Sequence, residues 1–593
     1  MSRRERREES RFTRRTLLLA SAQGVLMTAL LGRLVYLGGA RSSHYTTLSQ
    51  KNRVRLRFCV PPRGRLLDRT GMILAQDEMV YRLVFYPRET KDPVGALNAV
   101  KKVISLPLVD VHALAKTKEV QILKEPLSWE EVCTLEIQGP DLEAMSVEKG
   151  SLRLYPQRIP FCHITGYVQP PSKDEVTENP AWNLPDFRLG KEGAEKAFEE
   201  LLQGTPGYRE IEVNARGHEI RELTVKPGVQ GKDLSLSIHG GLQRYVMERL
   251  ATFESACCVV LHKKTGEVLC LASSPSYDPN LFVQGISLAD WTTLRDNPYA
   301  ALTNKSIRGQ YAPGSLVKMI VALAALRHDK ITPTTPIQCT GYCELNGHRY
   351  HCWRTHGSVN VVSALRESCD VFFYETAKKV GIDAIEKMAR LLGLGAETGI
   401  ELYGEKSGLV PGKAWKKKAQ NRSWTVGDTI LSSIGQGASL ATPLQMALMM
   451  ARLVGDGHAY TPTLLKDHTQ ALPDLGLDPK HLAVIREAMG QVVNHPSGTS
   501  YNQRLAIPGL EMGGKTATSQ VRRISMKERK TRVLKNEEIE WQKRDHAIFA
   551  GYAPVADPRF VICVVIEHGG GGGRVATPVA RDILTYAQQE ISL

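Results

Sequence analysis

The chain has 593 residues, too many for a single hydrophobic core, and its 42% hydrophobic and 23% charged residues are ordinary for a globular protein. The formal net charge of +15 allows nucleic acid, an anionic membrane surface or an acidic substrate as a partner. No segment matches a nucleic-acid-binding module, so we expect no nucleic acid partner. The 11 cysteines are odd in number and spread along the chain, which argues against a disulfide framework.

The first predicted element is a membrane anchor. Residues 17–37 are apolar apart from a few small or polar residues and Arg33, and this length spans a bilayer. Seven arginines against three glutamates precede the segment, so the positive-inside rule places the N-terminus in the cytoplasm and the residues after 38 outside. A cleaved signal peptide is the alternative, but the segment is longer than a typical signal-peptide core and no clear cleavage site follows it. We therefore expect a tail and single-pass anchor at residues 1–38.

A second region is predicted at residues 39–235. The stretch 61–71 indicates a turn, a short strand and another turn, which Arg63 and Asp68 could hold together by pairing. Further along, residues 190–196 are typical of the start of an amphipathic helix, and residues 213–217 are typical of a hairpin tip.

A third region is predicted to begin at residue 236. A strand at 234–238 and a helix at 242–250 mark the boundary. Two apolar runs, 257–261 and 267–272, then predict a β-hairpin with the basic tip 262–266. The tip contains a literal Lys-Thr-Gly, which we interpret as an ordinary basic turn.

The candidate nucleophile is Ser315. Pro313 and Gly314 set a turn, and an apolar run follows at once, so Ser315 is expected at the start of a buried helix, where free backbone N–H groups could hold an oxyanion. Lys318 lies one turn further on the same face, and burial favours the neutral amine that a base requires. The same Ser-x-x-Lys spacing occurs at Ser146, in a charged stretch without such a turn, so spacing alone decides nothing.

Serine β-lactamases and penicillin-binding proteins combine Ser-x-x-Lys with a Ser-Asp-Asn and a Lys-Thr-Gly motif. Two stretches could supply the second motif. Ser358 and Asn360 match Ser-x-Asn literally, whereas Ser368 and Asp370 stand directly before an apolar helical run. We favour Ser368 and Asp370, because that run would hold the side chains at the edge of a packed helix.

The third motif is predicted at residues 513–520, which contain Lys515, Thr516, Ala517 and Thr518 among small residues suited to close backbone approach. A basic residue and hydroxyls on one strand could bind a substrate carboxylate.

With these motifs in this order, the chain resembles the class B penicillin-binding proteins, the membrane-anchored D,D-transpeptidases of peptidoglycan. The resemblance covers nearly the whole chain. The further matching segments are 63–64 with 68–69, 190–196, 275–280, 304–305, 313–315, 427–430, 435–437, 442–445 and 549–554. The Ser-x-Asp motif and the segment 368–374 resemble the elongation type, penicillin-binding protein 2, more than the division type.

The resemblance implies an α/β (α+β) fold. Residues 236–593 would form a penicillin-binding transpeptidase domain, an antiparallel sheet flanked by helices, and residues 39–235 an elongated pedestal of the dimerisation type after the transmembrane helix. The location implied is a bacterial inner membrane, with the N-terminus in the cytoplasm and the catalytic domain in the periplasm. The partners implied are stem peptides, β-lactams, the membrane, a polytopic glycan-polymerising glycosyltransferase and other elongation-complex proteins.

The resemblance also implies a reaction. Ser315 would attack the carbonyl between the last two D-alanines of a stem peptide, and Lys318 would take its proton. The backbone N–H groups of Ser315 and Thr518 would hold the oxyanion. Ser368 would relay a proton to the leaving amine, and Asp370 would orient the lysines. A side-chain amine of a second stem would then attack the acyl-enzyme, and penicillin would block the enzyme as a stable acyl mimic.

The substrate strand is where the chain departs from the family. Lys515, Thr516 and Thr518 would bind the terminal carboxylate, but Ala517 replaces the usual glycine. A methyl group facing the cleft would tighten the fit, so Ala517→Gly is expected to speed acylation by bulky β-lactams more than by small ones. Asp370 departs as well, since it cannot donate a hydrogen bond as an asparagine amide would.

No cofactor is expected for catalysis, and one structural zinc ion is a hypothesis. Cys339, Cys352, His356 and Cys369 bracket the second motif, and three thiols with an imidazole suit tetrahedral zinc. A disulfide is the competing interpretation in an oxidising compartment, and Cys343 is an alternative ligand.

Two other functions stay open, a division-type transpeptidase and a sensor that is acylated by penicillin without crosslinking. Three features are interpreted as structural: His546, a mobile loop at Gly569 to Gly573, and an exposed insertion from Arg522 to Arg544.

Overall fold

The computed structural model describes residues 3–40, 54–106, 111–117, 120–138, 142–178, 187–213, 219–455, 457–522, 528, 532 and 534–591. The chain divides into two compact units, Met1–Pro61 with Gly204–Gln230 and Pro62–Gln203 with Gly231–Leu593. The predicted hairpin tip at 213–217 lies, except for its first residue, outside the described residues.

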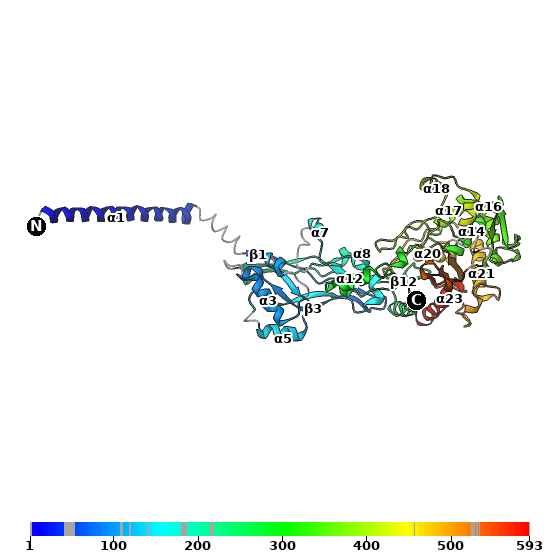
Figure 1. Ribbon diagram of the computed structural model, residues 1–593, viewed down its shortest axis with the longest axis horizontal. Coiled ribbons are helices and arrows are strands. Elements are labelled where there is room, and N and C mark those ends of the chain that lie inside the picture. Colours follow the sequence, from blue (N-terminus) through cyan, green and yellow to red (C-terminus); the bar gives the residue numbers. More distant parts are fainter. Residues whose placement is uncertain are drawn as a thin grey trace. The chain divides into compact units, whose positions relative to one another are not determined.

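The first unit contains the predicted anchor. Helix α1 (Arg3–Val35) continues into a π-helical turn, η1 (Tyr36–Ala40), and Figure 1 draws α1 as one uninterrupted helix. Among the described residues, Arg14–Gly39 is the one stretch long and apolar enough to cross a membrane, and none of it is buried inside the protein. The unit also has an antiparallel sheet of three strands, β1 (Val54–Cys59), β8 (Gly207–Val213) and β9 (Glu219–Lys226).

A five-stranded sheet organises the N-terminal part of the second unit. Its order is β10-β2-β3-β4, with β5 paired along β3. Helices α3 (Pro93–Val103) and α5 (Trp129–Gln138) bury their apolar faces with β3 and β4 in one hydrophobic cluster. The strands are β2 (Leu66–Leu67), β3 (Ile73–Phe85), β4 (Gln121–Lys124), β5 (Met145–Leu154) and β10 (Leu234–Ser235).

The strand predicted at 234–238 is shorter than expected. β10 ends at Ser235. The Leu236 N–H still donates to the Leu67 carbonyl, but Leu236 and Ser237 also pair with the segment around Leu464 and Leu465. The helix predicted at 190–196 is also short, α8 (Gly193–Ala197).

Arg63 does not pair with Asp68, so that prediction is wrong. The Arg63 guanidinium binds Glu195 at 2.6 Å and Glu199 at 2.7 Å. The Asp68 carboxylate instead accepts backbone N–H groups of its own turn and of Gly240, which begins the distant helix α10 (Gly240–Leu250). Arg153 binds the same Glu195 carboxylate at 2.7 Å, and Glu195 is completely buried. The two arginines share the buried Glu195 carboxylate, and each binds one further, partly exposed carboxylate, Glu199 or Asp77, so every buried charge of this ion-pair network has a partner.

The C-terminal part of the second unit is built on a second five-stranded sheet, which is antiparallel throughout in the order β12-β11-β19-β18-β17. The predicted hairpin is confirmed as its first two strands. The strands are β11 (Ala256–His262), β12 (Val268–Ser274), β17 (Gly513–Ser519), β18 (His546–Ala553) and β19 (Phe560–Ile566).

The sheet is covered on both faces, and so its strands are apolar at nearly every position. Successive residues of β11 alternate between two hydrophobic clusters, Val259 in one and Cys258 and Val260 in the other. One cluster includes α10 (Gly240–Leu250) and α23 (Gly572–Glu590), and the other includes α14 (Val317–Arg327) and α20 (Pro443–Val454).

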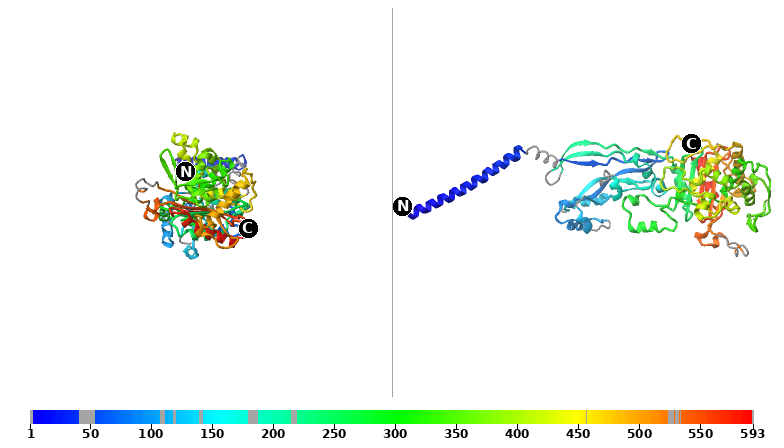
Figure 2. Two further views of the ribbon diagram at one scale, coloured as in Figure 1. Left: turned by 90° about the vertical axis from the view of Figure 1, so that its right-hand side faces the viewer. Right: turned by 90° about the horizontal axis from the view of Figure 1, so that it is seen from above.

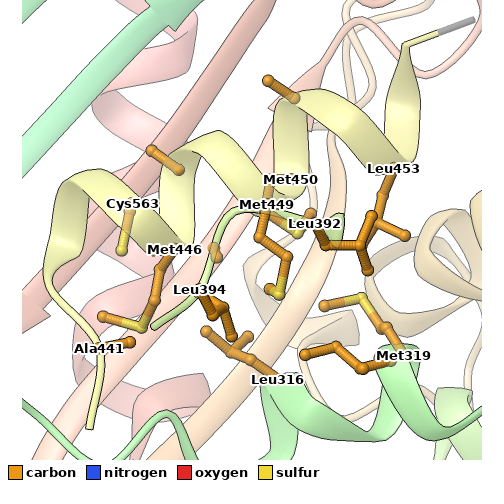
Figure 3. Packing of buried hydrophobic residues seen from close by; sticks show 14 of the residues in the cluster. Leu316, Met319, Leu392, Leu394, Ala441, Met446, Met449, Met450, Leu453 and Cys563 are labelled. Atoms are coloured by element: carbon orange, nitrogen blue, oxygen red, sulfur yellow. The ribbon is translucent and has the colours of Figure 1, made fainter. Parts of the chain in front are cut away.

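Helix α20 lies between the sheet and the helix that follows the candidate nucleophile. Figure 3 shows Met446 and Met449 of α20 pointing toward Leu316 and Met319 beside and within α14. Every residue of α14 except the last is buried. Because protein interiors are close-packed, this contact fixes the position of the serine turn.

Further helices surround the sheet, and α16, α17 and α21 lie near α14 and α20 in Figure 1. The remaining elements that the site and its surroundings use are α6 (Cys162–Thr165), α11 (Asn280–Val283), α12 (Leu288–Arg295), α13 (Lys305–Arg308), α15 (Val361–Arg366), α16 (Asp370–Val380), α17 (Ile382–Leu391), α18 (Lys413–Gln420), α19 (Val426–Ser432) and α21 (Pro479–Asn494).

The five glycines at 569–573 were expected to form one mobile loop, but they do not. The last two begin helix α23, and a Cβ on Gly572 would lie 2.3 Å from the carbonyl oxygens of Ala517 and Ile548. A glycine is required there because the helix begins against the backbone of β17 and β18. The described part of the insertion before β18 includes the short turns η8 (Asn536–Glu538) and η9 (Trp541–Lys543), and the orange segment that contains them projects from the sheet in the right-hand view of Figure 2.

Candidate active site

Ser315 lies in a 3₁₀ turn, η6 (Gly314–Leu316), that leads directly into α14, as predicted. Gly314 adopts a φ of +54°, and a Cβ there would lie 3.1 Å from the Thr518 carbonyl oxygen and 3.3 Å from the Ala517 Cβ. The turn therefore packs closely against strand β17, and a glycine suits both its backbone conformation and this close approach.

Three of the predicted side chains meet at a single hydroxyl, the Oγ of Ser368. This oxygen lies 3.2 Å from Ser315 Oγ, 3.0 Å from Lys318 Nζ and 3.1 Å from Lys515 Nζ. These residues come from η6, α14, the segment before α16 and β17, so the fold brings together all three motifs that the sequence singled out.

Ser368 is held in an uncommon backbone conformation. Its φ is +57°, in the left-handed region that residues other than glycine seldom adopt. Such strain persists only where the surroundings enforce it, and it is concentrated at functional sites. Here it turns the Ser368 hydroxyl and carbonyl toward the same amine, since Lys318 Nζ donates to both, at 3.0 Å and 2.9 Å.

The two lysines have different electrostatic surroundings. Lys318 Nζ has three acceptors, of which Asp370 Oδ1 at 2.7 Å is a carboxylate, and this arrangement holds an ammonium group. Lys515 is completely buried, and burial together with the nearby Lys318 charge lowers its pKa well below the usual range, although Asp370 opposes this shift. Burial therefore favours the neutral form of Lys515, and a carboxylate lies beside Lys318 on the other side of Ser368.

Comparisons with known proteins agree with this geometry. The description "Penicillin binding protein transpeptidase domain" matches residues 256–585, and "Penicillin-binding Protein dimerisation domain" matches residues 59–236. The chain belongs to the penicillin-binding protein transpeptidase family.

Relatives of the transpeptidase match along nearly its whole length. Peptidoglycan D,D-transpeptidase MrdA of Haemophilus influenzae is 35% identical over 98% of this chain and 92% of its own. The penicillin-binding protein 2 (PBP2) in complex with MreC from Helicobacter pylori has a TM-score of 0.81 and 28% identity, covering 90% of this chain and 99% of that one. A chain of a peptidoglycan synthase complex has a TM-score of 0.71 and 29% identity, covering 98% and 99%. The predicted fold class and the serine D,D-transpeptidase activity of the elongation type are confirmed.

The alternative second motif of the transpeptidase has a structural role. Asn360 caps helix α15 through a capping box with Ser363, and Ser358 lies in the short strand β16 (Gly357–Val359), which pairs with β13 (Ile337–Cys339). The literal Lys-Thr-Gly at residues 264–266 forms the turn between β11 and β12, as interpreted from the sequence. Chain spacing alone does not separate these copies from the residues that meet at Ser368.

The substrate strand β17 alternates its side chains between two faces. Lys515 points inward to Ser368, and Thr516 contacts Thr499 with a 3.1 Å distance between hydroxyls. Thr518 is the exposed position of the strand. Exposure makes Thr518 available to a ligand.

Ala517 does not face the cleft, contrary to the expectation. Its side chain is 3% exposed and belongs to the main hydrophobic cluster, because the serine turn covers it: a Cβ on Gly314 would lie 3.3 Å from the Ala517 Cβ. The methyl group packs against the serine turn and has no room to contact a substrate.

Ala517→Gly is therefore expected to lower the stability of the transpeptidase by about 1–2 kcal/mol, since a buried methyl is lost and glycine weakens a strand. Acylation by small and bulky β-lactams should change by the same factor. Thermal unfolding and acylation rates measured with both kinds of β-lactam check this. Selective acceleration of the bulky compounds would show that the methyl does restrict the cleft.

Sequence reasoning assigned no role to Gln436. Its side-chain amide donates to the Thr518 carbonyl at 3.3 Å, and the preceding Gly435 carbonyl accepts from Gly314 N–H at 3.1 Å. The loop after α19 therefore braces the serine turn and strand β17 together. The signal was present in the sequence as the segment Gly435 to Gly437, one of the family-like matches.

The four residues expected to bind zinc are close together. The ligand atoms of Cys339, Cys352, His356 and Cys369 all lie within 4.8 Å of one another. The His356 Nδ1 is 3.5 Å from the sulfur atoms of both Cys339 and Cys352. The alternative ligand, Cys343, lies elsewhere and donates to Glu375 Oε1.

The cysteine cluster is joined to the second motif. Cys369 stands between Ser368 and Asp370, and the backbone N–H of Asp370 donates to Cys352 Sγ at 3.2 Å. A hydrogen bond from Cys369 lowers the pKa of Cys352, although burial opposes this shift. His546 is packed against Tyr311 and His568 at the far end of β18, which agrees with a structural role.

Proposed function

We propose that Ser315 is the nucleophile of a D,D-transpeptidase that crosslinks peptidoglycan stem peptides during cell-wall elongation. The observation that carries this proposal is the position of Ser368 Oγ within 3.2 Å of Ser315, Lys318 and Lys515 together. A hydroxyl in contact with a nucleophile and two amines can pass protons among them in a buried, preorganised site.

Lys318 is the base in this proposal. The Asp370 carboxylate lies beside Lys318, burial favours the neutral form of Lys515, and Ser368 contacts both amines. Transfer of one proton from Lys318 through Ser368 to Lys515 leaves Lys318 neutral, with Asp370 still holding its position. Lys318 can then accept the Ser315 proton as the serine oxygen attacks the substrate carbonyl.

The leaving amine receives that proton through Ser368, and D-alanine departs. The oxyanion is held by the backbone N–H groups of Ser315 and Thr518, and Lys515, Thr516 and Thr518 bind the terminal carboxylate. An amine of a second stem then attacks the ester, loses a proton to Lys318 and restores the Ser315 hydroxyl. A β-lactam enters by the same first step and stays as the acyl-enzyme.

We also propose the domain boundaries, the cellular location and the partners of the protein. The chain divides into an anchor at 1–38, a pedestal at 39–235 and a transpeptidase domain at 236–593. The anchor crosses a bacterial inner membrane once, with the N-terminus in the cytoplasm and the catalytic domain in the periplasm. The partners are a polytopic glycan-polymerising glycosyltransferase and other elongation-complex proteins, a proposal supported by the relatives studied with MreC and within a synthase complex.

A crosslinking assay tests the proposed reaction against a penicillin-binding sensor. The full chain is incubated with lipid-linked precursor and a glycan polymerase, and the digested product is analysed by mass spectrometry for crosslinked stem peptides. Crosslinked dimers are expected with the wild type and none with Ser315→Ala. Labelling by penicillin without any crosslinked product would support the sensor instead.

We further propose that Cys339, Cys352, His356 and Cys369 bind one structural zinc ion. A tetrahedron with zinc–sulfur bonds of about 2.3 Å has edges of about 3.8 Å, which the cluster approaches with only small shifts. The ion would supply a closed four-ligand crosslink and would fix the loop that carries Ser368 and Asp370. A Cys339–Cys352 or Cys352–Cys369 disulfide is the competing outcome.

Protein purified without chelator is expected to contain about one zinc per chain by elemental analysis, because four such ligands form a complete structural site. Cys352→Ser should lose the metal and acylate more slowly, while Cys343→Ser, a matched cysteine outside the cluster, should keep both. Metal-free wild type with one thiol pair oxidised would reject zinc in favour of the disulfide.

A further inference from the structure

A basic surface on helix α18 is separate from the acyl-transfer residues. The ten residues from Lys413 to Arg422 include five basic residues and no acidic residue. Helix α18 lies beside α17 in Figure 1, and Lys413 reaches Asp383 of α17 at 2.5 Å. The proposed reaction gives no role to any of these cations.

Most of this charge is presented to solvent. We define the α18 surface by its four exposed cations, Lys413, Lys417, Lys418 and Arg422. The last three form no ion pair with any part of the chain that the structure describes. Lys413 is paired with Asp383, but both side chains are more than half exposed, so water screens that pair. The α18 surface therefore has an excess of positive charge that the protein itself does not neutralise.

The helix accounts for only part of this charge. Lys417 and Lys418 lie in the last turn of α18, where the helix dipole favours cations. Arg422 lies beyond the helix, after Asn421, which ends α18 with a φ of +51°. The dipole also gives no reason for the lack of carboxylates among cations that repel one another. An anionic partner would relieve that repulsion.

The side chains of α18 disfavour a lipid surface as the partner. A helix that lies in a membrane interface needs an exposed apolar face. The exposed residues of α18 are lysines, alanines and one glutamine, whereas Trp415 is only partly exposed. The indole of Trp424, just beyond the helix, donates to Thr429 Oγ1 at 2.8 Å and lies under the Lys416 ammonium group. The α18 surface thus offers charge without an apolar face, and it fits a hydrophilic polyanion.

Helix α18 is joined to the serine turn through α19. The fifth cation, Lys416, binds the Asp428 carboxylate, which also accepts the Thr425 backbone N–H at the start of α19. At the other end of α19, Gly435 contacts the serine turn and Gln436 contacts strand β17. Because α19 has seven residues, its two ends are about 10 Å apart at a rise of 1.5 Å per residue. The α18 surface is therefore close to the edge of the cleft.

We propose that the α18 surface docks an uncrosslinked peptidoglycan strand through the carboxylates of its stem peptides. This inference rests on the proposed function, in which such a strand supplies the second stem. Each uncrosslinked stem ends in a carboxylate, so the strand is a polyanion whose charges repeat along its length. Single exposed ion pairs are weak, but several on one strand raise the effective concentration of the neighbouring stems. An extended stem of about four residues spans about 13 Å, so a docked strand can offer its amine to the acyl-enzyme.

Co-sedimentation of the full chain in detergent with isolated peptidoglycan sacculi tests this proposal. The protein is first acylated with penicillin, so that the cleft is blocked. The protein is expected in the pellet at low salt and in the supernatant at about 1 M NaCl, where the screening length falls to about 3 Å. Sacculi whose carboxylates have been converted to amides should not retain it. Absence of binding, or binding that ignores salt or amidation, would overturn the proposal. Failure of Ser315 to be acylated at the outset would instead count against the proposed function.

Variants of the α18 surface test which residues bind the strand. The triple variant Lys417→Gln/Lys418→Gln/Arg422→Gln should bind sacculi roughly tenfold more weakly, the effect of losing three weak ion pairs. The charge-preserving Lys417→Arg/Lys418→Arg should bind as the wild type does. An unchanged unfolding midpoint shows that the triple variant is folded. If the midpoint falls, Arg422→Gln alone decides, because Arg422 lies outside the helix and its loss should still weaken binding about twofold.

A matched control removes the same number of charges elsewhere. Lys264, Lys330 and Lys480 are exposed on other elements of the second unit, and their triple replacement by Gln should leave binding unchanged. Equal losses in the two triple variants would show that net charge, and not the α18 surface, binds the strand, and would overturn the proposal. A soluble short-chain phosphatidylglycerol should displace the protein from sacculi no better than sodium acetate at the same concentration. Preferential displacement by the lipid would identify a lipid surface as the partner and would overturn the proposal as well.

Discussion

Lys318→Ala is expected to slow acylation by penicillin by about 10²–10⁴-fold, the usual contribution of a positioned general base. The substitution removes the amine that takes the Ser315 proton and leaves Asp370 without the ammonium group that it binds at 2.7 Å. Ser368 keeps its contact with Lys515, so the relay survives in part, but no amine then lies on the serine helix. Stopped-flow acylation with a fluorescent penicillin measures the rate.

A matched control is available in the hairpin between β11 and β12. Lys264 belongs to a literal Lys-Thr-Gly but is exposed on a turn, so Lys264→Ala should acylate at the wild-type rate. If Lys318→Ala acylates within a few-fold of the wild type while Lys264→Ala does too, the base is another group, and Lys515 becomes the first alternative.

Glu195→Ala is expected to destabilise the fold by about 3–5 kcal/mol, because it removes the buried carboxylate that two buried arginines share and leaves each with one partly exposed partner, Glu199 or Asp77. Glu195 is completely buried, and its carboxylate binds Arg63 at 2.6 Å and Arg153 at 2.7 Å. The exposed pair Arg65–Asp233 is the control, and Asp233→Ala should cost at most about 1 kcal/mol. Thermal unfolding compares the two variants, and equal small losses would show that the buried network adds no stability.

The same network predicts a pH dependence. Burial raises the pKa of Glu195, but Arg153 and Arg63 outweigh it, so the folded-state pKa lies below the ordinary carboxyl value of 4.5. A depressed carboxyl pKa stabilises the fold fully above the ordinary value, and this contribution is lost as the pH falls through the folded-state pKa. The unfolding midpoint of the wild type should therefore fall in acid more steeply than that of Glu195→Gln. Parallel curves would contradict the depressed pKa.

The sequence alone predicted the elements that form because of residues adjacent to them in the chain. The turn before Ser315 and the apolar helix after it predicted the serine helix, and the two apolar runs predicted the β11–β12 hairpin. Helical continuation after Asp370 identified the second motif even though Ser358 and Asn360 match it more literally. In each case the neighbouring residues carried the information that spacing alone lacked.

Contacts between residues far apart in the sequence could not be predicted from the sequence alone. Arg63 has Asp68 within five residues, but its partner Glu195 is 132 residues away, and only the folded structure shows that the nearer carboxylate is occupied by backbone N–H groups. Ala517 was wrongly expected to line the open cleft, because the sequence does not show that the distant turn at Gly314 covers its methyl group. The role of Gln436 depends on two loops meeting at the serine turn.

The most direct test of the central claim is to find the residue that penicillin acylates. The full chain is labelled with a fluorescent penicillin, digested, and the modified peptide is sequenced by mass spectrometry. The label is expected on Ser315 and should disappear in Ser315→Ala, while Ser146→Ala, the other serine with a lysine three residues on, should label as the wild type does. Label on any other residue, or retained labelling of folded Ser315→Ala, would contradict the account.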